Sequence, residues 1–242
     1  MHMARTKSGI PGVDEIIGGG FPEGTCCLVT GTAGSGRTIF GVQFLYNGIT
    51  EFAENGVYVS LENRPKDLRY EMLNFGWDLK KMEDQNKMAI VDIGFARDHN
   101  KSSEKYTLTM GSRLNVSALS VHIFEVCKEV KAKRVVIDSL PSLQLRLKNI
   151  TEMRRATSLL CDLLLEIGRT SLMITETAVP QPLSRYGFEE HITRGVIVMQ
   201  SIPQNGELKR TIQVLKMLGT RHSTRMYPME ITGQGIVVNS LL

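Results

Sequence analysis

The stretch CCLVTGTAGSGRT, residues 26–38, decides the fold of this chain. Its first five residues are typical of a buried strand, and apolar residues with helical spacing begin directly after Thr38. Between them, GTAGSGRT (31–38) follows the phosphate-loop pattern G-x-x-x-x-G-K-[ST] with one change. The glycines of such a loop let backbone N–H groups turn inward around an anion, at the positive end of the following helix. The stretch therefore predicts a nucleotide site.

Arg37 is the change, since lysine is usual at this position. Lysine is a compact charge that reaches the β- and γ-phosphates, whereas a guanidinium is broader, planar and permanently charged. Attraction for a polyphosphate survives the exchange, but we expect a poorer fit around the transferring phosphoryl group. A glycine-rich turn without a ligand is the alternative, and the order of strand, loop and helix favours nucleotide binding over it.

Two carboxylates end apolar runs elsewhere in the chain. Asp138 ends RVVID, where an aspartate can hold Mg²⁺ beside a phosphate loop, and capping of the next turn is the alternative. Glu62 ends GVYVSLE, where a carboxylate can orient or deprotonate an attacking water, and an exposed loop glutamate is the alternative. With a phosphate loop in the same chain, the metal role is the better account of Asp138.

Short apolar runs alternate with longer stretches of helical spacing along the first three quarters of the chain. The runs are CCLVT (26–30), GVYVSL (56–61), MAIVDI (88–93), RVVIDSL (134–140) and SLMIT (171–175). The helical stretches are 38–54, 65–75, 116–130 and 152–167. Runs that are apolar throughout indicate a mostly parallel sheet covered by helices on both faces, which is an α/β fold.

The pattern changes after residue 194. GVIVMQSI (195–202), a turn at Asn205-Gly206 and KRTIQVLKM (209–217) predict a hairpin, and a later pair around 231–238 continues it. We therefore expect antiparallel strands at the C-terminal edge of the sheet. Residues 94–112 show no period and few apolar side chains, so we expect a solvated excursion there.

The composition is that of an ordinary globular protein. The chain has 242 residues, of which 42% are hydrophobic, and a formal charge of +4, so we expect one domain over residues 1–242. No apolar run approaches the ~20 residues of a membrane span, and the polar start MHMARTKSG is unlike a signal peptide. We expect a cytoplasmic protein without membrane contact. The mild positive charge does not by itself predict nucleic-acid binding.

Several ordered motifs together resemble a known family. They are SGIPGVDEIIGGGFPEG (8–24), the phosphate loop, IFGVQFLYNGI (39–49), GVYVSLENRPKDL (56–68), NFGWDL (74–79), VVIDSL (135–140) and LKMLGTRHS (215–223). From about Ser8 to Val238 the chain resembles KaiC-domain ATPases of the RecA superfamily, in particular the single-domain archaeal KaiC-like proteins. The resemblance implies a RecA-like fold and a ring, commonly a hexamer, with ATP between neighbouring subunits.

The resemblance also assigns roles to residues. The loop positions that would hold the phosphates of ATP are Gly31, Thr32, Ala33, Gly34, Ser35, Gly36, Arg37, Thr38 and Ile39. Thr38 and Asp138 would hold Mg²⁺, Glu62 the attacking water, and Asn74 matches a nucleotide-contacting position. The positions that would reach ATP from the adjacent subunit are Lys216, Met217, Thr220, His222 and Thr232.

Departures from the family pattern surround the same site. Besides Arg37, paired glutamates become Glu62-Asn63, Leu218 replaces the arginine supplied by the neighbour, Gly233 replaces an aspartate near the base or ribose, and Arg194 replaces another. An arginine finger contributes on the order of 10³ to 10⁵ in rate, so its loss predicts slow or absent hydrolysis unless Arg221 or Arg37 substitutes. The chain would then be a nucleotide-sensing module whose protein partner the sequence does not identify.

Two other functions stay open. An active Mg²⁺-dependent ATPase rests on Thr38, Asp138 and Glu62. A recombinase-like protein that binds single-stranded DNA rests on the loop 180–194, whose cationic and stacking groups would be Arg185, Arg194, Tyr186 and Phe188. An ordinary surface loop is the better account of that segment.

Overall fold

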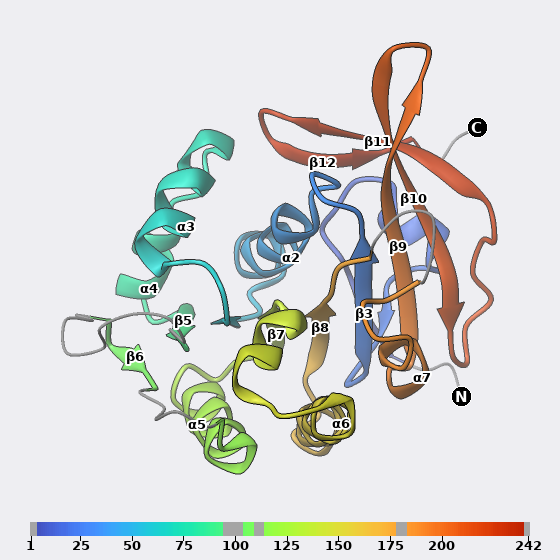
Figure 1. Ribbon diagram of the computed structural model, residues 1–242. Coiled ribbons are helices and arrows are strands. Elements are labelled where there is room, and N and C mark those ends of the chain that lie inside the picture. Colours follow the sequence, from blue (N-terminus) through green and yellow to red (C-terminus); the bar gives the residue numbers. More distant parts are fainter. Residues whose placement is uncertain (1–3, 94–103, 109–113, 178–182, 240–242) are drawn as a thin grey trace.

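One large mixed sheet organises the computed structural model, which describes residues 4–93, 104–108, 114–177 and 183–239. Ten strands of the described part join in the order β12-β11-β10-β9-β3-β8-β7-β4-β5-β6 (Figure 1). Their bounds are β3 (Cys26–Gly31), β4 (Gly56–Ser60), β5 (Met88–Asp92), β6 (Tyr106–Thr107), β7 (Arg134–Asp138), β8 (Thr170–Ile174), β9 (Gly195–Gln204), β10 (Glu207–Met217), β11 (Met226–Thr232) and β12 (Gly235–Val238). A small second sheet pairs β1 (Arg5–Thr6) with β2 (Phe21–Pro22).

The sheet confirms the predicted fold class. The seven strands from β9 to β6 in this order pair in parallel, and β10, β11 and β12 continue the sheet antiparallel. All five predicted apolar runs form strands, and the predicted hairpin is β9 and β10. Its turn residues Asn205 and Gly206 have φ of 54° and 83°, the left-handed conformations that a tight hairpin turn requires.

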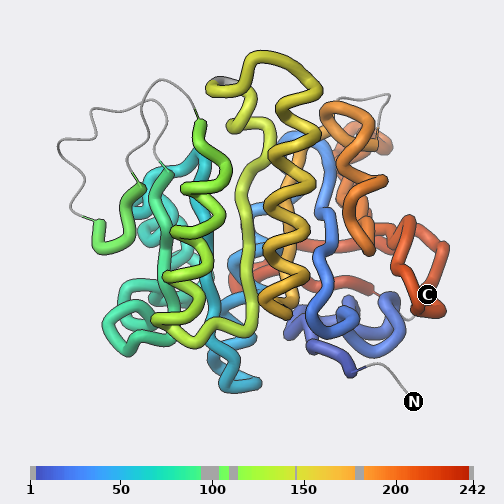
Figure 2. The backbone as a smooth tube through the Cα atoms, turned by 90° about the horizontal axis from the view of Figure 1, so that it is seen from below, coloured from blue at the N-terminus to red at the C-terminus, as the bar shows by residue number. Residues whose placement is uncertain are grey.

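Helices cover both faces of this sheet. Their bounds are α1 (Val13–Ile16), α2 (Arg37–Phe52), α3 (Pro65–Met72), α4 (Leu79–Asp84), α5 (Val116–Glu129), α6 (Ile150–Glu166) and α7 (Glu189–Ile192), with 3₁₀ turns at Leu73–Phe75 and Leu140–Arg146. Helices α2 and α3 lie on one face, while α5 and α6 lie on the other and stand in front of the strands in Figure 2. The four predicted helices are present. Helix α4 was not predicted, and the side chain of Asp78 caps its N-terminus by accepting a hydrogen bond from Lys81 N.

The strands alternate their side chains between two apolar layers. Tyr58 and Val136 belong to the layer under α2, whereas Val57, Val59 and Val135 belong to the layer under α5 and α6. All five are completely buried. Burial on both faces explains why the runs read as continuously apolar in the sequence. No helix within the described ranges is long and apolar enough to cross a membrane.

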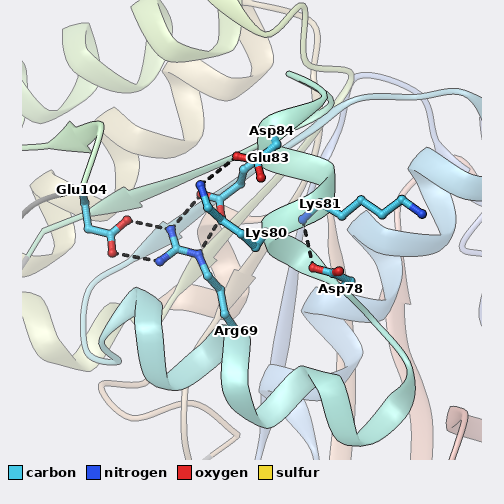
Figure 3. Close-up of polar contacts among 7 residues, drawn as sticks. All are labelled: Arg69, Asp78, Lys80, Lys81, Glu83, Asp84 and Glu104. Carbon is cyan, nitrogen blue, oxygen red and sulfur yellow. Dashed lines mark hydrogen bonds and ion pairs between the residues drawn. The ribbon is translucent and has the colours of Figure 1, made fainter.

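The predicted excursion at residues 94–112 is partly wrong. Residues 94–103 and 109–112 lie outside the described ones, but Tyr106–Thr107 forms β6, which pairs with β5, and Tyr106 is 9% exposed. Arg69 on α3 fixes the start of this piece, because its guanidinium lies 2.6 Å from both Glu83 and Glu104 (Figure 3). A two-residue strand is too short for any periodic pattern, so the sequence could not reveal it.

Arg134, at the start of β7, is a buried cation with an expected role in stability. It is 0% exposed, its Nε donates to Glu54 Oε2 at 2.7 Å, and its Nη1 donates to Phe44 O at 2.8 Å. Burial lowers the pKa of the guanidinium, and Glu54 opposes that shift. We expect Arg134→Met to lower the free energy of unfolding by about 2 kcal/mol, because one partner of a buried pair is lost while Glu54, at 32% exposure, regains water.

Chemical denaturation measures this change. The matched control is Lys80→Met, which breaks the exposed Lys80–Asp84 pair and should leave the denaturation midpoint unchanged. An equal loss of unfolding free energy in the two variants would show that the buried ion pair of Arg134 stabilises the fold no more than an exposed pair does.

Candidate nucleotide-binding site

The predicted phosphate loop connects β3 to α2 at the carboxyl end of the parallel strands. Gly34 and Gly36 have φ of 74° and 93°, and Gly36 caps the N-terminus of α2. The positive φ of Gly36 favours glycine, and a Cβ added there would lie 2.9 Å from Cδ1 of Ile231, so the end of that side chain would have to move. The local geometry is therefore that of a strand, an anion-binding turn and a helix N-terminus, as the sequence predicts.

Hydrogen bonds from neighbouring strands hold the loop in place. The N–H of Thr32 donates to Met199 O at 3.2 Å, and its hydroxyl accepts from Ser201 N at 2.9 Å. Arg210 on β10 donates from Nε to Gly34 O at 3.0 Å. Arg210 carries no sequence signal, because only the pairing of β10 with β9 brings it to the loop. The loop is thus shaped by the sheet before any ligand binds.

Arg37 points from the loop to the end of β8. Its Nη1 donates to Thr175 O at 2.5 Å. Burial lowers the pKa of the guanidinium, whereas the carboxylates of Asp138, Glu176 and Glu62 raise it. Arginine remains charged in such surroundings, so a fixed cation stands among the carboxylates at this edge. Glu176, which the sequence reasoning missed, also forms an ion pair with Arg185 at 2.7 Å.

The structure brings Thr38 and Asp138 together. The hydroxyl of Thr38 donates to Asp138 Oδ2 at 2.7 Å, and the hydroxyl of Tyr58 donates to the same oxygen at 2.6 Å. Burial raises the pKa of Asp138, while the hydrogen bonds from Tyr58 and Thr38 and the charge of Arg37 oppose that shift. A threonine hydroxyl and a carboxylate are oxygen ligands of the kind that Mg²⁺ takes beside phosphates, so the residues present fit this ion.

Glu62 lies on the same edge of the sheet. Ser60, two residues before it, is paired with Asp138 across β4 and β7. The Glu62 carboxylate accepts from Ser139 Oγ at 2.9 Å and from Ser142 Oγ at 3.2 Å. It is exposed, which leaves it accessible to a water molecule. Glu62 therefore lies where a carboxylate can act on a water beside the loop.

Asn74 is exposed on a 3₁₀ turn and donates to Glu71 O at 3.1 Å. Met217, by contrast, lies far from the phosphate loop of its own chain. Met217, at the end of β10, pairs with Gly195, which pairs with Cys27 near the amino end of β3. Four residues of strand, about 13 Å, separate that level from the loop at the opposite end of β3. The end of β10 could therefore reach a nucleotide only on another subunit.

The end of β10 lies beside α7 in Figure 1, and the residues around it differ in how far their side chains are exposed. Lys216 Nζ donates to Glu190 O at 2.6 Å, and Met217 is buried with its sulfur 3.8 Å from that of Cys27. Leu218 is 45% exposed. Thr220 accepts from Arg5 at 2.7 Å, and His222 Nδ1 lies 2.9 Å from Ser223 O. The side chain of Met217 is thus a core group, and only its backbone is left for a neighbour.

Thr232 ends β11 and Gly233 begins the turn to β12, while the preceding Ile231 packs against Gly36 of the same chain. β11 is antiparallel to β10, so its end lies at the edge of the sheet that carries the phosphate loop. Within one chain, Thr232 therefore lies at the opposite end of the sheet from Lys216, and its contact with a nucleotide across a subunit boundary stays a prediction.

The residues proposed for stacking on DNA are engaged within the chain. Phe188 is 5% exposed and stacks on Tyr186 with ring centroids 5.9 Å apart. The hydroxyl of Tyr186 donates to Gln144 at 2.6 Å, and Arg185 is paired with Glu176. Residues 180–182 of the proposed loop lie outside the described ranges. The prediction that Phe188 is available to a base is wrong, because the side chain belongs to the core.

Comparisons with known proteins show the family to which this chain belongs. The family model described as "ATPase: KaiC" matches residues 6–242. The circadian clock oscillator protein KaiC of Synechococcus elongatus is 37% identical over 235 residues, 97% of this chain and 44% of that protein. The UPF0273 protein of Thermotoga maritima is 38% identical over 237 residues, 97% of this chain and 95% of that protein. The chain thus spans about half the length of the clock-protein relatives that it matches.

A solved structure shares the whole arrangement. The crystal structure of a KaiC-like protein from the archaeon Pyrococcus horikoshii has a TM-score of 0.85 and 46% identity, over 98% of this chain and 99% of that one. The parallel strands with an antiparallel C-terminal edge and helices on both faces are those of a RecA-like fold. With a phosphate loop, a Thr38–Asp138 pair and a family model that covers nearly every residue, the chain belongs to the KaiC family of ATPases.

Proposed function

We propose that the chain binds ATP and Mg²⁺ between the subunits of a ring, with residues 1–242 as one nucleotide-binding domain, and hydrolyses ATP slowly or not at all. The observation that carries this proposal is the contrast within the loop. Thr38 and Asp138 are paired at 2.7 Å as a metal site requires, whereas Arg37, in place of lysine, is tethered to Thr175 O. The groups that would bind the metal, Thr38 and Asp138, are those of the family, whereas the group that would contact the transferring phosphate, Arg37, is altered.

The residues would divide the work as follows. The loop N–H groups and Arg37 bind the polyphosphate, and Thr38 and Asp138 hold Mg²⁺, which when bound neutralises charge on the phosphate oxygens. Glu62 orients the attacking water. Arg37 carries a broad, planar guanidinium where a compact ammonium is usual, and its Nη1 donates to Thr175 O. Slow turnover follows from this altered group and from Leu218, whose side chain has no donor for a γ-phosphate.

A ring, expected to be a hexamer, accounts for the residues at the far end of β10. Lys216 and Leu218 lie at the opposite end of the sheet from the loop of their own chain, so they can approach a nucleotide only on a neighbour. Each subunit would present its loop to one neighbour and the end of β10 to the other. Such a head-to-tail contact closes into a ring when its rotation permits.

One experiment on the wild type tests the proposal. With ATP and Mg²⁺ at about 100 times the dissociation constant, binding to the native state alone adds about 2.7 kcal/mol, so we expect the melting temperature to rise by about 5 °C or more. The oligomeric mass should reach that of a ring, and phosphate release should stay at the level of Glu62→Gln. Unchanged melting and mass with ATP would contradict the proposal.

The second candidate is an active Mg²⁺-dependent ATPase. Glu62 favours it, because this carboxylate lies on the same edge as Asp138 and is hydrogen-bonded to Ser139. Phosphate release that is fast in the wild type and lost in Glu62→Gln would favour this candidate over slow turnover, with nucleotide binding common to both.

A further inference from the structure

Tyr58 is a buried phenol whose hydroxyl reaches the proposed metal site. It lies in the middle of β4 and is 0% exposed. The backbone of Tyr58 pairs with Val136, two residues before Asp138 on β7, so the ring extends along the sheet toward the strand end. Its hydroxyl donates to Asp138 Oδ2 at 2.6 Å. A residue of the apolar layer under α2 thereby contacts the carboxylate that ends the neighbouring strand.

Two hydroxyls from different elements fix one oxygen of Asp138. Tyr58 donates to Oδ2 from β4, and Thr38 donates to the same atom from the first turn of α2. Oδ1 has no hydrogen-bond partner within the described residues, which leaves it for a metal ion or its water. The threonine hydroxyl belongs to the loop and would itself contact the metal. The phenol of Tyr58, by contrast, would contact the carboxylate of Asp138 and not the metal.

A merely structural explanation is that the buried hydroxyl needs some acceptor. Burial of an unpaired hydroxyl costs about 1–3 kcal/mol, so any acceptor would satisfy it. The acceptor here is the Asp138 carboxylate, and hydrogen bonds to ionised acceptors are about twice as strong as neutral ones. The rigid ring also leaves the hydroxyl little freedom of position, since χ1 and χ2 are enclosed by the core.

We propose that Tyr58 is a positioning residue for the metal site, which holds the Asp138 carboxylate so that Mg²⁺ binds beside the nucleotide without reorganisation. This inference rests on the proposed function, because it assumes that Asp138 serves Mg²⁺. Loss of an outer partner of a ligating carboxylate typically lowers metal affinity by about 10- to 100-fold. Tyr58 thus affects the nucleotide only through the metal.

The test is Tyr58→Phe, which removes a single oxygen atom. Binding of a fluorescent ATP analogue is titrated with Mg²⁺, and we expect the Mg²⁺ concentration for half-maximal enhancement to rise about 10-fold. Affinity for the analogue in EDTA should stay within about twofold of the wild type. The matched control is Tyr106→Phe, whose hydroxyl also donates to a carboxylate, Glu129, at 2.8 Å, but on the outer strand β6. It should leave the Mg²⁺ titration unchanged.

Two measurements keep the outcome decisive. Melting without nucleotide reports the folded state of each variant independently of the metal. Tyr58→Phe in an Asp138→Asn background should change the Mg²⁺ titration no further, because the phenol acts through that carboxylate. A Tyr58→Phe titration equal to the wild type overturns the role of Tyr58 and leaves the proposed function standing. A wild type that binds no analogue, with or without Mg²⁺, overturns both.

Discussion

The double variant Arg37→Lys/Leu218→Arg is expected to release phosphate from ATP faster than the wild type by a factor on the order of 10³, the lower end of what an arginine finger contributes. Leu218 is 45% exposed at the end of β10, so an arginine there can extend toward a neighbouring subunit. Lysine at position 37 restores a compact charge and removes the planar group that now donates to Thr175 O.

Phosphate release at saturating ATP and Mg²⁺ measures this gain. Each single variant should gain less, because one departure remains in it. The matched control is Arg37→Lys/Leu215→Arg, since Leu215 is 43% exposed on the same strand and adds the same charge away from the predicted contact. An equal gain in the control would contradict the role of Leu218 alone, because both variants carry Arg37→Lys. No gain in the double variant would contradict the argument that Arg37 and Leu218 limit turnover.

The second large effect is expected for Asp138→Asn. The carboxylate is 5% exposed, and an amide of the same shape can still accept from Thr38 and Tyr58, so we expect the fold to be retained. The amide lacks the negative charge that a hard cation such as Mg²⁺ prefers. We expect affinity for an ATP analogue to fall about 100-fold with Mg²⁺, and to change little in EDTA.

Fluorescence titration with and without Mg²⁺ separates these two affinities. Asp92→Asn is the matched control, since Asp92 ends the parallel strand β5 and is 8% exposed, yet β4 lies between it and β7. If Asp92→Asn weakened binding as much as Asp138→Asn did, the effect would reflect the acidic edge as a whole and not a metal site at Asp138.

Local patterns were sufficient for much of this molecule. Runs such as 26–30 and 134–140 form strands because a strand covered on both faces must be apolar throughout, and Asn205-Gly206 forms a turn because both residues tolerate positive φ. Thr38 and Asp138 were paired from their positions at a loop and at a strand end, and the structure sets them 2.7 Å apart. The sequence did not reveal the short strand β6 or the contacts that restrain Phe188.

The sequence by itself determined the phosphate loop, the order of strands and helices and the departures at Arg37 and Leu218. Each of these depends only on a local pattern of neighbouring residues. Only the tertiary structure decided that Arg37 reaches Thr175, that Arg210 donates to Gly34, that Ile231 packs against Gly36 and that Tyr58 donates to Asp138. These contacts join strands distant in sequence, and sheet order and side-chain direction set them. A buried tyrosine looks like any other core residue until its neighbour across the sheet is known.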